Sequence, residues 1–168
     1  MDTLGRGCET ASSVREGRSL LIKVVIADDH PLIRTAVRTY LETQEGFDVL
    51  AVGETGEEAV DLVREHSPDV VVLDYQMPVL DGLEAARSIG KTNPDVGIVM
   101  LTAADDRRVA QAAAGAGIGG FVLKTDPPEA LADTVRRVAA GEEGEHTLTV
   151  IVEPESAPDH PDGPGAGP

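Results

Sequence analysis

Five short apolar runs, each followed by a segment with helical spacing, constrain the fold of this chain more than any other feature. The runs contain few polar residues and are rich in β-branched side chains, which is typical of strands buried on both faces. A repeated strand–helix unit predicts an α/β domain whose parallel sheet is covered by helices on both sides. The predicted strands lie at residues 20–29, 47–52, 69–74, 96–103 and 119–124.

The segments between the runs read as helices. Thr55 with Glu58 forms a capping box, and Asp81 with Glu84 resembles a second cap, so these pairs predict where two helices begin. Other segments are placed by the spacing of their apolar residues or by helix-opening prolines. The predicted helices span about 30–44, 55–66, 81–89, 105–114 and 126–140.

The chain has 168 residues, of which 41% are hydrophobic, enough for one domain of ordinary size with tails. Residues 1–19 show no helical or strand period and read as a flexible leader. Residues 20–140 form the predicted domain. Residues 141–168 carry seven acidic side chains, no Lys or Arg, and many Pro and Gly. Within this tail, 147–153 alternates as a strand would, and we weigh one short strand at a sheet edge against disorder.

Charge and cysteine content exclude several classes of function. The formal net charge is −16 and no segment is locally basic, which opposes direct binding to DNA or RNA phosphates. Cys8 is the single cysteine, so an internal disulfide and a multi-cysteine metal site are excluded. No apolar stretch approaches the roughly 20 residues of a membrane span, and the N-terminus lacks a signal-peptide core. We expect a cytoplasmic protein without a membrane partner.

Polar side chains follow the ends of four of the five predicted strands. In open α/β sheets, sites form outside the carboxyl ends of the strands, so these side chains are expected to share one edge. Three carboxylates brought together there repel, each pair by about 4 kcal/mol at 4 Å with an effective dielectric of 20. A hard divalent cation such as Mg²⁺ fits a set of oxygen ligands. The residues concerned are Asp28, Asp29, Asp74, Thr102 and Lys124.

This arrangement predicts a specific chemistry. A carboxylate can act as a nucleophile and form an aspartyl phosphate, and Asp74, which ends a buried apolar strand, is the candidate acceptor. Mg²⁺ and Lys124 would neutralise the charge of the transferring phosphoryl group. Thr102 would donate a hydrogen bond to one of its oxygens.

The stretches IADDHP, VVLDYQMPVLDG, MLTA and FVLK, in this order, resemble the receiver domain of bacterial two-component response regulators over about residues 20–140. The opening ADDHP is most similar to the subfamily that usually carries a LuxR-type helix-turn-helix. The resemblance implies a flavodoxin-like (CheY-like) doubly wound fold with strand order 2-1-3-4-5. It also implies that a sensor histidine kinase or phosphotransfer protein phosphorylates Asp74, and that Asp28, Asp29, Asp74 and the backbone carbonyl of Gln76 hold Mg²⁺.

The same resemblance implies a switch. Thr102 and Lys124 would read the phosphate, and Phe121 matches an aromatic switch position, although core packing explains a strand aromatic equally well. Switching would remodel the face made by 105–114, 119–124 and 126–140, to which a downstream protein would bind. A second copy of the chain is a further possible partner, in a homodimer that forms on phosphorylation. The protein would be a phosphoryl acceptor, not an enzyme, and would assist its own phosphorylation and dephosphorylation.

Two departures and one absence qualify the resemblance. Thr125 stands where many receivers have a proline after the lysine, so the isomer of the Lys124–Thr125 bond is left open. His30 is interpreted as a helix-start residue before Pro31, not as a metal ligand. After Ala140 only 28 residues remain, fewer than a helix-turn-helix needs, which predicts a stand-alone receiver that does not bind DNA.

Three other interpretations stay open from the residues alone. A flavodoxin-like domain could bind an organic cofactor at the same edge, but it would need a Gly-rich or hydroxyl-rich phosphate loop where ADDHP stands. A Mg²⁺-dependent phosphatase with an aspartate nucleophile would usually carry a second acid at the position of Gln76. A receiver-like module could also signal by protein contact without being phosphorylated.

Overall fold

The computed structural model of the protein describes residues 20–103 and 115–142. Its core is a five-stranded parallel sheet in the order β2-β1-β3-β4-β5, which confirms the predicted fold class and strand order. The strands are β1 Ile22–Ala27, β2 Phe47–Gly53, β3 Val70–Asp74, β4 Gly97–Thr102 and β5 Gly120–Leu123. The helices are α1 Pro31–Thr43, α2 Gly56–His66, α3 Gly82–Thr92 and α5 Pro128–Ala139.

Several predictions fall outside the described residues. They are the flexible leader at 1–19, the alanine-rich helix at 105–114, and almost all of the tail, including the strand weighed at 147–153. These stay predictions. None of the helices within the described ranges is both long and apolar enough to cross a lipid bilayer.

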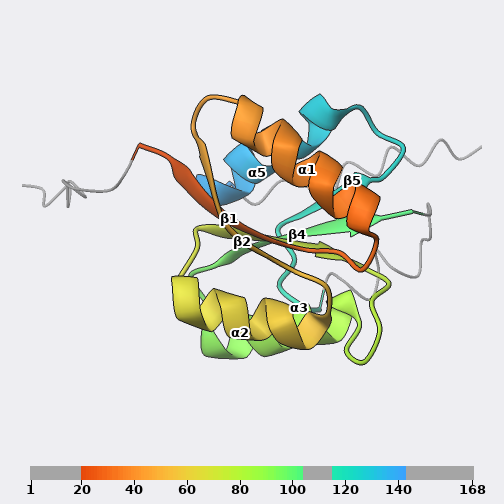
Figure 1. Cartoon of the computed structure of the whole chain (residues 1–168). Coiled ribbons are helices and arrows are strands. Elements are labelled where there is room, and N and C mark those ends of the chain that lie inside the picture. The colour runs from red at the N-terminus through yellow and green to blue at the C-terminus, as the bar shows by residue number, and fades with distance from the viewer. Residues whose placement is uncertain (1–19, 104–114, 143–168) are drawn as a thin grey trace, which may run out of the picture.

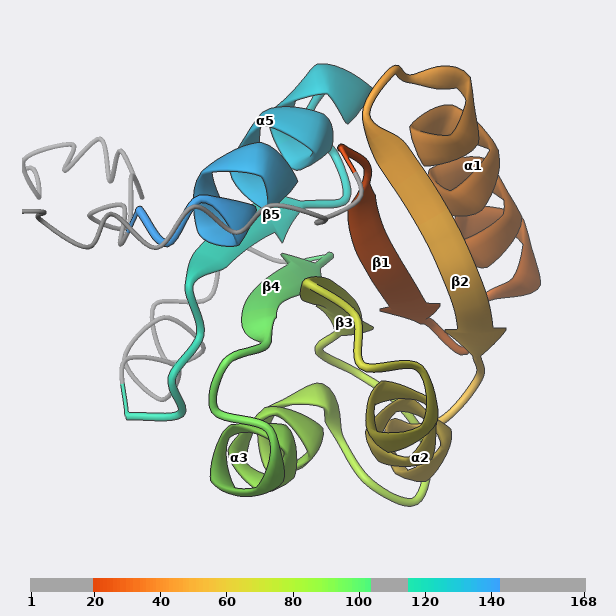
Figure 2. The same ribbon diagram turned by 90° about the vertical axis from the view of Figure 1, so that its left-hand side faces the viewer.

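The helices cover both faces of the sheet, α1 and α5 on one side and α2 and α3 on the other (Figures 1 and 2). Successive strand residues therefore enter different apolar layers: Val24 and Ile26 pack toward α1 and α5, whereas Val25 and Ala27 pack toward α2 and α3. Every residue of β3, Val70–Asp74, is buried. This explains why the central strands read as continuous apolar runs instead of alternating ones.

The two predicted helix caps are present. The Thr55 hydroxyl accepts a hydrogen bond from the Glu58 N–H at 3.2 Å, and the Asp81 carboxylate accepts one from the Glu84 N–H at 2.8 Å. Each cap satisfies an N–H group that has no partner within the helix. Both caps stand directly after a loop at the carboxyl edge of the sheet, so they help fix the loops that surround the site.

Helix α3 is longer than predicted. It runs to Thr92 and not to Ile89, because Ile89 is fully buried against the core and the chain stays helical through Gly90. A glycine inside a helix costs about 1 kcal/mol relative to alanine, which tertiary packing can offset. Apolar periodicity therefore predicted the buried face of α3 but not its exposed last turn.

Helix α5 begins slightly later than predicted, at Pro128. Asp126, expected to open the helix, instead accepts a hydrogen bond from the Leu123 N–H at 2.9 Å and closes the turn after β5. Pro127 is the N-cap residue and makes no side-chain capping bond. The turn after β5 is thus held by a hydrogen bond from the last strand residue, Leu123, and not by a cap of α5.

Two glycines allow helices to lie directly against the site loops. A Cβ on Gly82 would overlap the carbonyl oxygen of Asp74, and a Cβ on Gly56 would overlap that of Leu80. Gly82 does not have a positive φ, so the reason for a glycine there is this close approach of the backbone. The start of α3 is therefore packed on the end of β3, where Asp74 lies.

Gly82→Ala is expected to lower the free energy of unfolding by about 1–3 kcal/mol, because the added methyl group forces α3 away from the end of β3. Gly90→Ala is the matched control in the same helix, since its Cβ would meet only the Ala116 carbonyl oxygen at 3.9 Å. That variant should be unchanged or more stable by up to about 1 kcal/mol. Urea unfolding followed by circular dichroism measures both. Equal stability of the two variants would show that the close approach at Gly82 is not limiting.

Candidate functional site

The strand order brings the predicted site residues to one edge of the sheet. Strands β1 and β3 are neighbours at the point where the winding reverses, so the acids that follow β1 lie beside the acid that ends β3. Strand β5 lies two positions from β3, yet the side chain of Lys124 reaches across. Its Nζ is 3.1 Å from Asp28 Oδ2 and 3.1 Å from Asp74 Oδ2. The structure thus brings together Asp28, Asp74 and Lys124 in direct contact.

This acidic pocket holds more negative than positive charge. Asp28 and Asp74 are only 1% and 2% exposed, and they share the single ammonium of Lys124. Burial raises the pKa of the Asp74 carboxyl above its ordinary value, and the nearby charge of Asp28 raises it further. Lys124 and the Gln76 N–H, which donates to Asp74 Oδ1 at 3.3 Å, act in the opposite direction. The pocket is electrostatically incomplete without another cation.

The carboxylate oxygens leave ligand positions free. The Lys124 ammonium is shared by Asp28 Oδ2 and Asp74 Oδ2, and the His30 ring lies 2.8 Å from Asp29 Oδ1. Two positively charged or polar groups thus face three carboxylates, whose oxygens keep lone pairs for a further ligand. Asp28, Asp29, His30 and Asp74 each offer one ligand atom, and these atoms lie within 4.8 Å of one another. The donor set fits a divalent cation.

The loop after β3 borders the pocket. Met77 is buried and anchors this loop on the core, whereas Gln76 and Pro78 are exposed. Asp29 and Gln76 line the same open hollow at the edge of the sheet. Val79 adopts a φ of +71°, an unusual conformation for a β-branched residue, in the turn that leads to α3.

The loop after β1 is held by an arginine that the sequence analysis did not assign to the site. Arg34, one turn into α1, donates from Nη1 to the Asp28 carbonyl oxygen at 2.8 Å and pairs through Nη2 with Glu54 at 2.7 Å. It therefore ties the acid-bearing loop to the end of β2. The available signal was its place in the first turn of the helix that follows the two acids, but spacing alone does not show which way a helical side chain turns.

His30 is a helix-start residue, as predicted. It is the N-cap of α1, and its backbone N–H donates to Asp28 Oδ1 at 2.8 Å. Its ring nevertheless turns toward the acids, with Nδ1 2.8 Å from Asp29 Oδ1. The sequence analysis did not anticipate this second contact.

Thr102 and Phe121, the two residues of the predicted switch, both lie within the described residues. Thr102 ends β4 and is buried, and its carbonyl oxygen accepts the Lys124 N–H at 2.7 Å. Phe121 is half-buried beside the core layer of α2 and α3. The Lys124–Thr125 peptide bond, whose isomer the sequence left open, is trans.

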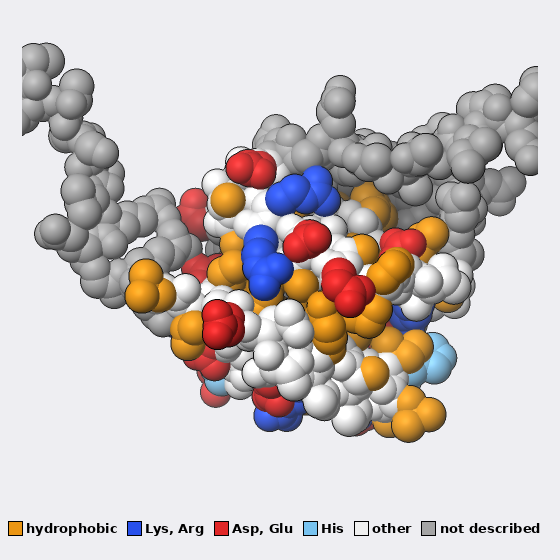
Figure 3. Space-filling model, turned by 90° about the horizontal axis from the view of Figure 1, so that it is seen from above, with side chains coloured by type: hydrophobic (Ala, Val, Ile, Leu, Met, Phe, Trp, Pro, Cys, Tyr) orange, Lys and Arg blue, Asp and Glu red, His pale blue; other side chains and the backbone are white. Residues whose placement is uncertain are grey.

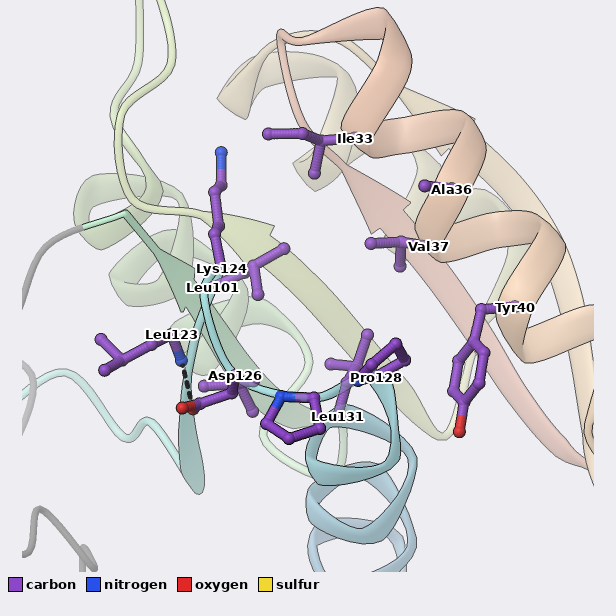
Figure 4. Close-up of a pocket in the computed structure, with 12 residues that line it drawn as sticks. Ile33, Ala36, Val37, Tyr40, Leu101, Leu123, Lys124, Asp126, Pro128 and Leu131 are labelled. Atoms are coloured by element: carbon purple, nitrogen blue, oxygen red, sulfur yellow. Dashed lines mark hydrogen bonds between the residues drawn. The ribbon is translucent and has the colours of Figure 1, made fainter.

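A second hollow lies beside the pocket, between α1 and the start of α5, with a volume of about 210 Å³ (Figure 4). Its walls are mainly apolar, and Lys124 borders it. Seen from this side, the molecule exposes apolar side chains flanked by acidic and basic ones (Figure 3). The lining includes Ile33, Val37, Tyr40, Pro127, Pro128 and Leu131.

Comparisons with known proteins agree with this geometry. The family described as the response regulator receiver domain matches residues 24–136. The transcriptional regulatory protein DegU of Brevibacillus brevis is 39% identical over 120 residues, which are 71% of this chain and 51% of DegU. The response regulator protein VraR of Staphylococcus aureus is 35% identical over 123 residues, 73% of this chain and 59% of VraR. The chain thus spans between half and three-fifths of the length of these relatives.

Solved structures give the same result. The signal receiver domain of NarL from Mycobacterium tuberculosis matches with a TM-score of 0.70 and 30% identity, over 73% of this chain and 99% of that domain. The isolated receiver domain of RcsB from Salmonella enterica, solved with the phosphomimetic BeF₃⁻, matches with a TM-score of 0.63 and 27% identity. The match covers 75% of this chain and 91% of the RcsB domain. These are signalling domains. By fold, sequence and the placement of its acidic pocket, the chain belongs to the response regulator receiver family.

Proposed function

We propose that this chain is the phosphoacceptor receiver of a two-component phosphorelay, in which Asp74 takes up a phosphoryl group. The observation that carries the proposal is the contact of two buried carboxylates, Asp28 and Asp74, with one ammonium, Lys124, at the carboxyl edge of the sheet. Such a pocket places the Asp74 carboxylate beside a positive charge at the edge of the sheet where ligands bind, and structural packing alone does not require it. The family match supports the same conclusion.

The chemical step uses groups of this chain. A carboxylate oxygen of Asp74 forms a bond to phosphorus while the phosphorus–nitrogen bond of a phosphohistidine breaks, and the imidazole leaves with the bonding electron pair. Lys124, already beside Asp74, stabilises the added negative charge, and Thr102 donates a hydrogen bond to a phosphoryl oxygen. The same groups would assist attack by water when Asp74 is dephosphorylated.

A divalent cation completes this pocket. Its free carboxylate oxygens fit Mg²⁺, with Asp28, Asp29, Asp74 and the backbone carbonyl of Gln76 as the protein ligands. When bound, Mg²⁺ would neutralise the charge of the transferring phosphoryl group.

The proposed output is a change of surface. Thr102 would move toward the phosphoryl group, and Phe121 would then turn into the volume it leaves. Lys124 would couple the phosphate to β5. The face affected is that of β5, α5 and the segment 105–114, which lies outside the described residues.

The proposed partners are proteins in the cytoplasm. A sensor histidine kinase or phosphotransfer domain would dock at the start of α1, because its phosphohistidine must reach Asp74 in line. Leu32, 86% exposed in this first turn, offers an apolar contact there. A downstream protein or a second phosphorylated copy would use the switched face, and no direct DNA contact is expected from a chain of net charge −16. Phosphoryl transfer from a purified sensor kinase tests the first of these partners.

The alternative functions differ in what they need from the same edge. An organic cofactor would place its phosphate against the loop that bears Asp28 and Asp29, where buried carboxylates repel it. A phosphatase would need a second acid where the exposed Gln76 stands. A receiver that works without phosphorylation would keep the fold yet leave Asp74 unmodified.

Incubation with acetyl phosphate and Mg²⁺ should add one phosphoryl group to the intact chain, as measured by mass spectrometry. Asp74→Asn should abolish the adduct, because the nucleophile is gone, and EDTA should suppress it in the unaltered protein. Asp81→Asn is the matched control, since asparagine retains the helix cap and Asp81 does not contact Lys124. A phosphoryl adduct on Asp74→Asn would show that the acceptor is another residue.

The raised pKa of Asp74 has a consequence for stability. The folded protein binds the proton of the Asp74 carboxyl more tightly than the unfolded chain does, so the protonated carboxyl contributes to the free energy of unfolding. This contribution is complete at a pH below the pKa of Asp74 in the unfolded chain, and it is lost as the pH rises through the pKa in the folded protein. Ionised Asp74 therefore destabilises the metal-free protein near neutral pH. In EDTA, Asp74→Asn should therefore raise Tm. A gain of about 1 kcal/mol in the free energy of unfolding corresponds to a rise of roughly 2–8 °C.

The difference in Tm between Asp74→Asn and the unaltered protein should shrink as pH falls from 7 toward 4. It should also shrink when Mg²⁺ is added, because the cation stabilises the ionised form. Thermal unfolding in matched buffers measures both trends. A difference that is independent of both pH and Mg²⁺ would contradict an electrostatic origin.

Lys124→Ala should still accept a phosphoryl group but should lose most of the conformational response in β5 and α5. The reason is that the charge linking the phosphate to β5 is absent. Hydrogen exchange before and after phosphorylation measures this response, with Lys91→Ala, an exposed site on α3, as the control. The same phosphorylation-induced exchange pattern in Lys124→Ala and the unaltered protein would remove Lys124 from the switch.

A further inference from the structure

One arginine connects the loops that follow β1 and β2. Arg34 donates from Nη1 to the Asp28 carbonyl oxygen at 2.8 Å and from Nη2 to the Glu54 carboxylate at 2.7 Å. The Asp28 N–H donates to the carbonyl oxygen of Gly53, the last residue of β2, at 3.2 Å. Both backbone polar groups of Asp28 are therefore tied to the end of β2, one directly and one through Arg34.

The loop after β2 is itself held by the first turn of α2. The Glu54 N–H donates to the Glu58 carboxylate at 2.8 Å, and the Glu58 N–H donates to the Thr55 hydroxyl at 3.2 Å. Bonds of this kind between side chains and backbone N–H groups fix the start of a helix. Glu54 is thus positioned through its backbone by α2, while its side chain holds Arg34.

The same turn of α2 also lies against the loop that follows β3. A Cβ on Gly56, the first residue of α2, would overlap the carbonyl oxygen of Leu80. Leu80 lies between Asp74 and the start of α3. The first turn of α2 therefore supports both loops that follow the acid-bearing strands, the loop of Asp28 through Arg34 and the loop after Asp74 by direct packing.

Stability gives no sufficient reason for an arginine at position 34. The Glu54 side chain is 64% exposed, and ion pairs with a partner so exposed contribute little to stability. A lysine would supply the same charge. A guanidinium, however, presents planar donors that bond two acceptors in a fixed geometry, which the ammonium of a lysine does not reproduce. What Arg34 adds is a fixed spacing between the Asp28 carbonyl group and Glu54.

We propose that Arg34 and Glu54 are positioning residues for the phosphoacceptor site. They hold the backbone of Asp28 so that its carboxylate stays beside that of Asp74, where both bind Mg²⁺. Among the described residues, neither side chain forms an ion pair with a carboxylate of the acidic pocket, so both act through the backbone. This inference rests on the proposed function, because it assumes that the pocket binds Mg²⁺ and that Asp74 is phosphorylated.

The sign of the change in Mg²⁺ affinity separates positioning from electrostatics. Arg34→Gln removes a positive charge that is bonded to the Asp28 carbonyl group, so the loss of repulsion alone would make Mg²⁺ bind more tightly. Loss of positioning makes Mg²⁺ bind more weakly. We expect binding to weaken about tenfold, a loss typical of removing a group that orients a metal ligand.

The test uses the full chain. Calorimetric titration measures Mg²⁺ affinity, and hydrogen exchange in EDTA measures how firmly the metal-free loop is held. Arg34→Gln should speed exchange of the Asp28 and His30 N–H groups about tenfold, because the loop opens locally more often. Arg38→Gln is the matched control, since it makes the same charge change one turn further along α1, where Arg38 pairs with Glu42. That variant should leave exchange in the loop unchanged and alter Mg²⁺ affinity less than about twofold.

Glu54→Ala is the second variant. Because Glu54 is exposed, this change removes the anchor of Arg34 with little risk to folding, and it decides the question if Arg34→Gln does not fold. It should speed exchange of the same two N–H groups. In the double variant, the loss of Mg²⁺ affinity should not exceed that of Arg34→Gln alone, because the two residues act as one unit. Additive losses would contradict that shared role.

Weaker Mg²⁺ binding together with faster exchange in Arg34→Gln supports the proposal. Unchanged or tighter binding, or unchanged exchange of the Asp28 and His30 N–H groups, overturns it. If acetyl phosphate and Mg²⁺ still modify Asp74 of the unaltered protein in that case, only this inference fails. If the unaltered protein neither binds Mg²⁺ nor is modified at Asp74, the proposed function fails, and exchange measured in EDTA still shows whether Arg34 holds the loop.

Discussion

The contact of Asp28 and Asp74 with Lys124 is the interaction on which the rest of the structure depends. Two carboxylates that are almost wholly removed from water share one ammonium. The fold therefore places more negative than positive charge in a buried pocket, which is unfavourable for stability. A protein selected only for stability would replace such a group with apolar side chains of similar volume. This group of two acids and one lysine lies at the carboxyl edge of the sheet, where ligands bind. The fold therefore accepts an unfavourable arrangement of charge at a position suited to function.

Other features of the fold hold that arrangement in place. The adjacency of β1 and β3 sets the two acids side by side, and the glycine at position 82 lets α3 pack directly on the Asp74 carbonyl. Arg34 fixes the loop that bears Asp28 from the opposite side. These supports act on the backbone carbonyl groups of Asp28 and Asp74, so they do not occupy the carboxylate oxygens. A backbone held in this way fixes where the two carboxylates lie, which a binding site for a small ion requires.

The sequence predicted the features that depend on local pattern. Apolar runs identified the five strands, and hydrogen-bonding caps identified the starts of α2 and α3. The rule that sites form at carboxyl ends then placed Asp28, Asp74 and Lys124 together correctly. What it missed depends on distances between segments remote in the sequence. The close approach at Gly82, the direction of Arg34 and the turn of the His30 ring toward the acids have no periodic signal, because each is set by packing.

Lys124 joins the acidic pocket to the molecular surface, and this link follows from the length of its side chain. Its ammonium contacts Asp28 and Asp74, while the same residue borders the apolar hollow between α1 and α5 (Figure 4). An aliphatic stem can cover apolar surface while its charged end stays in a polar site. Lys124 therefore belongs both to the acidic pocket and to the wall of the hollow, so one side chain connects the two without a longer chain of contacts.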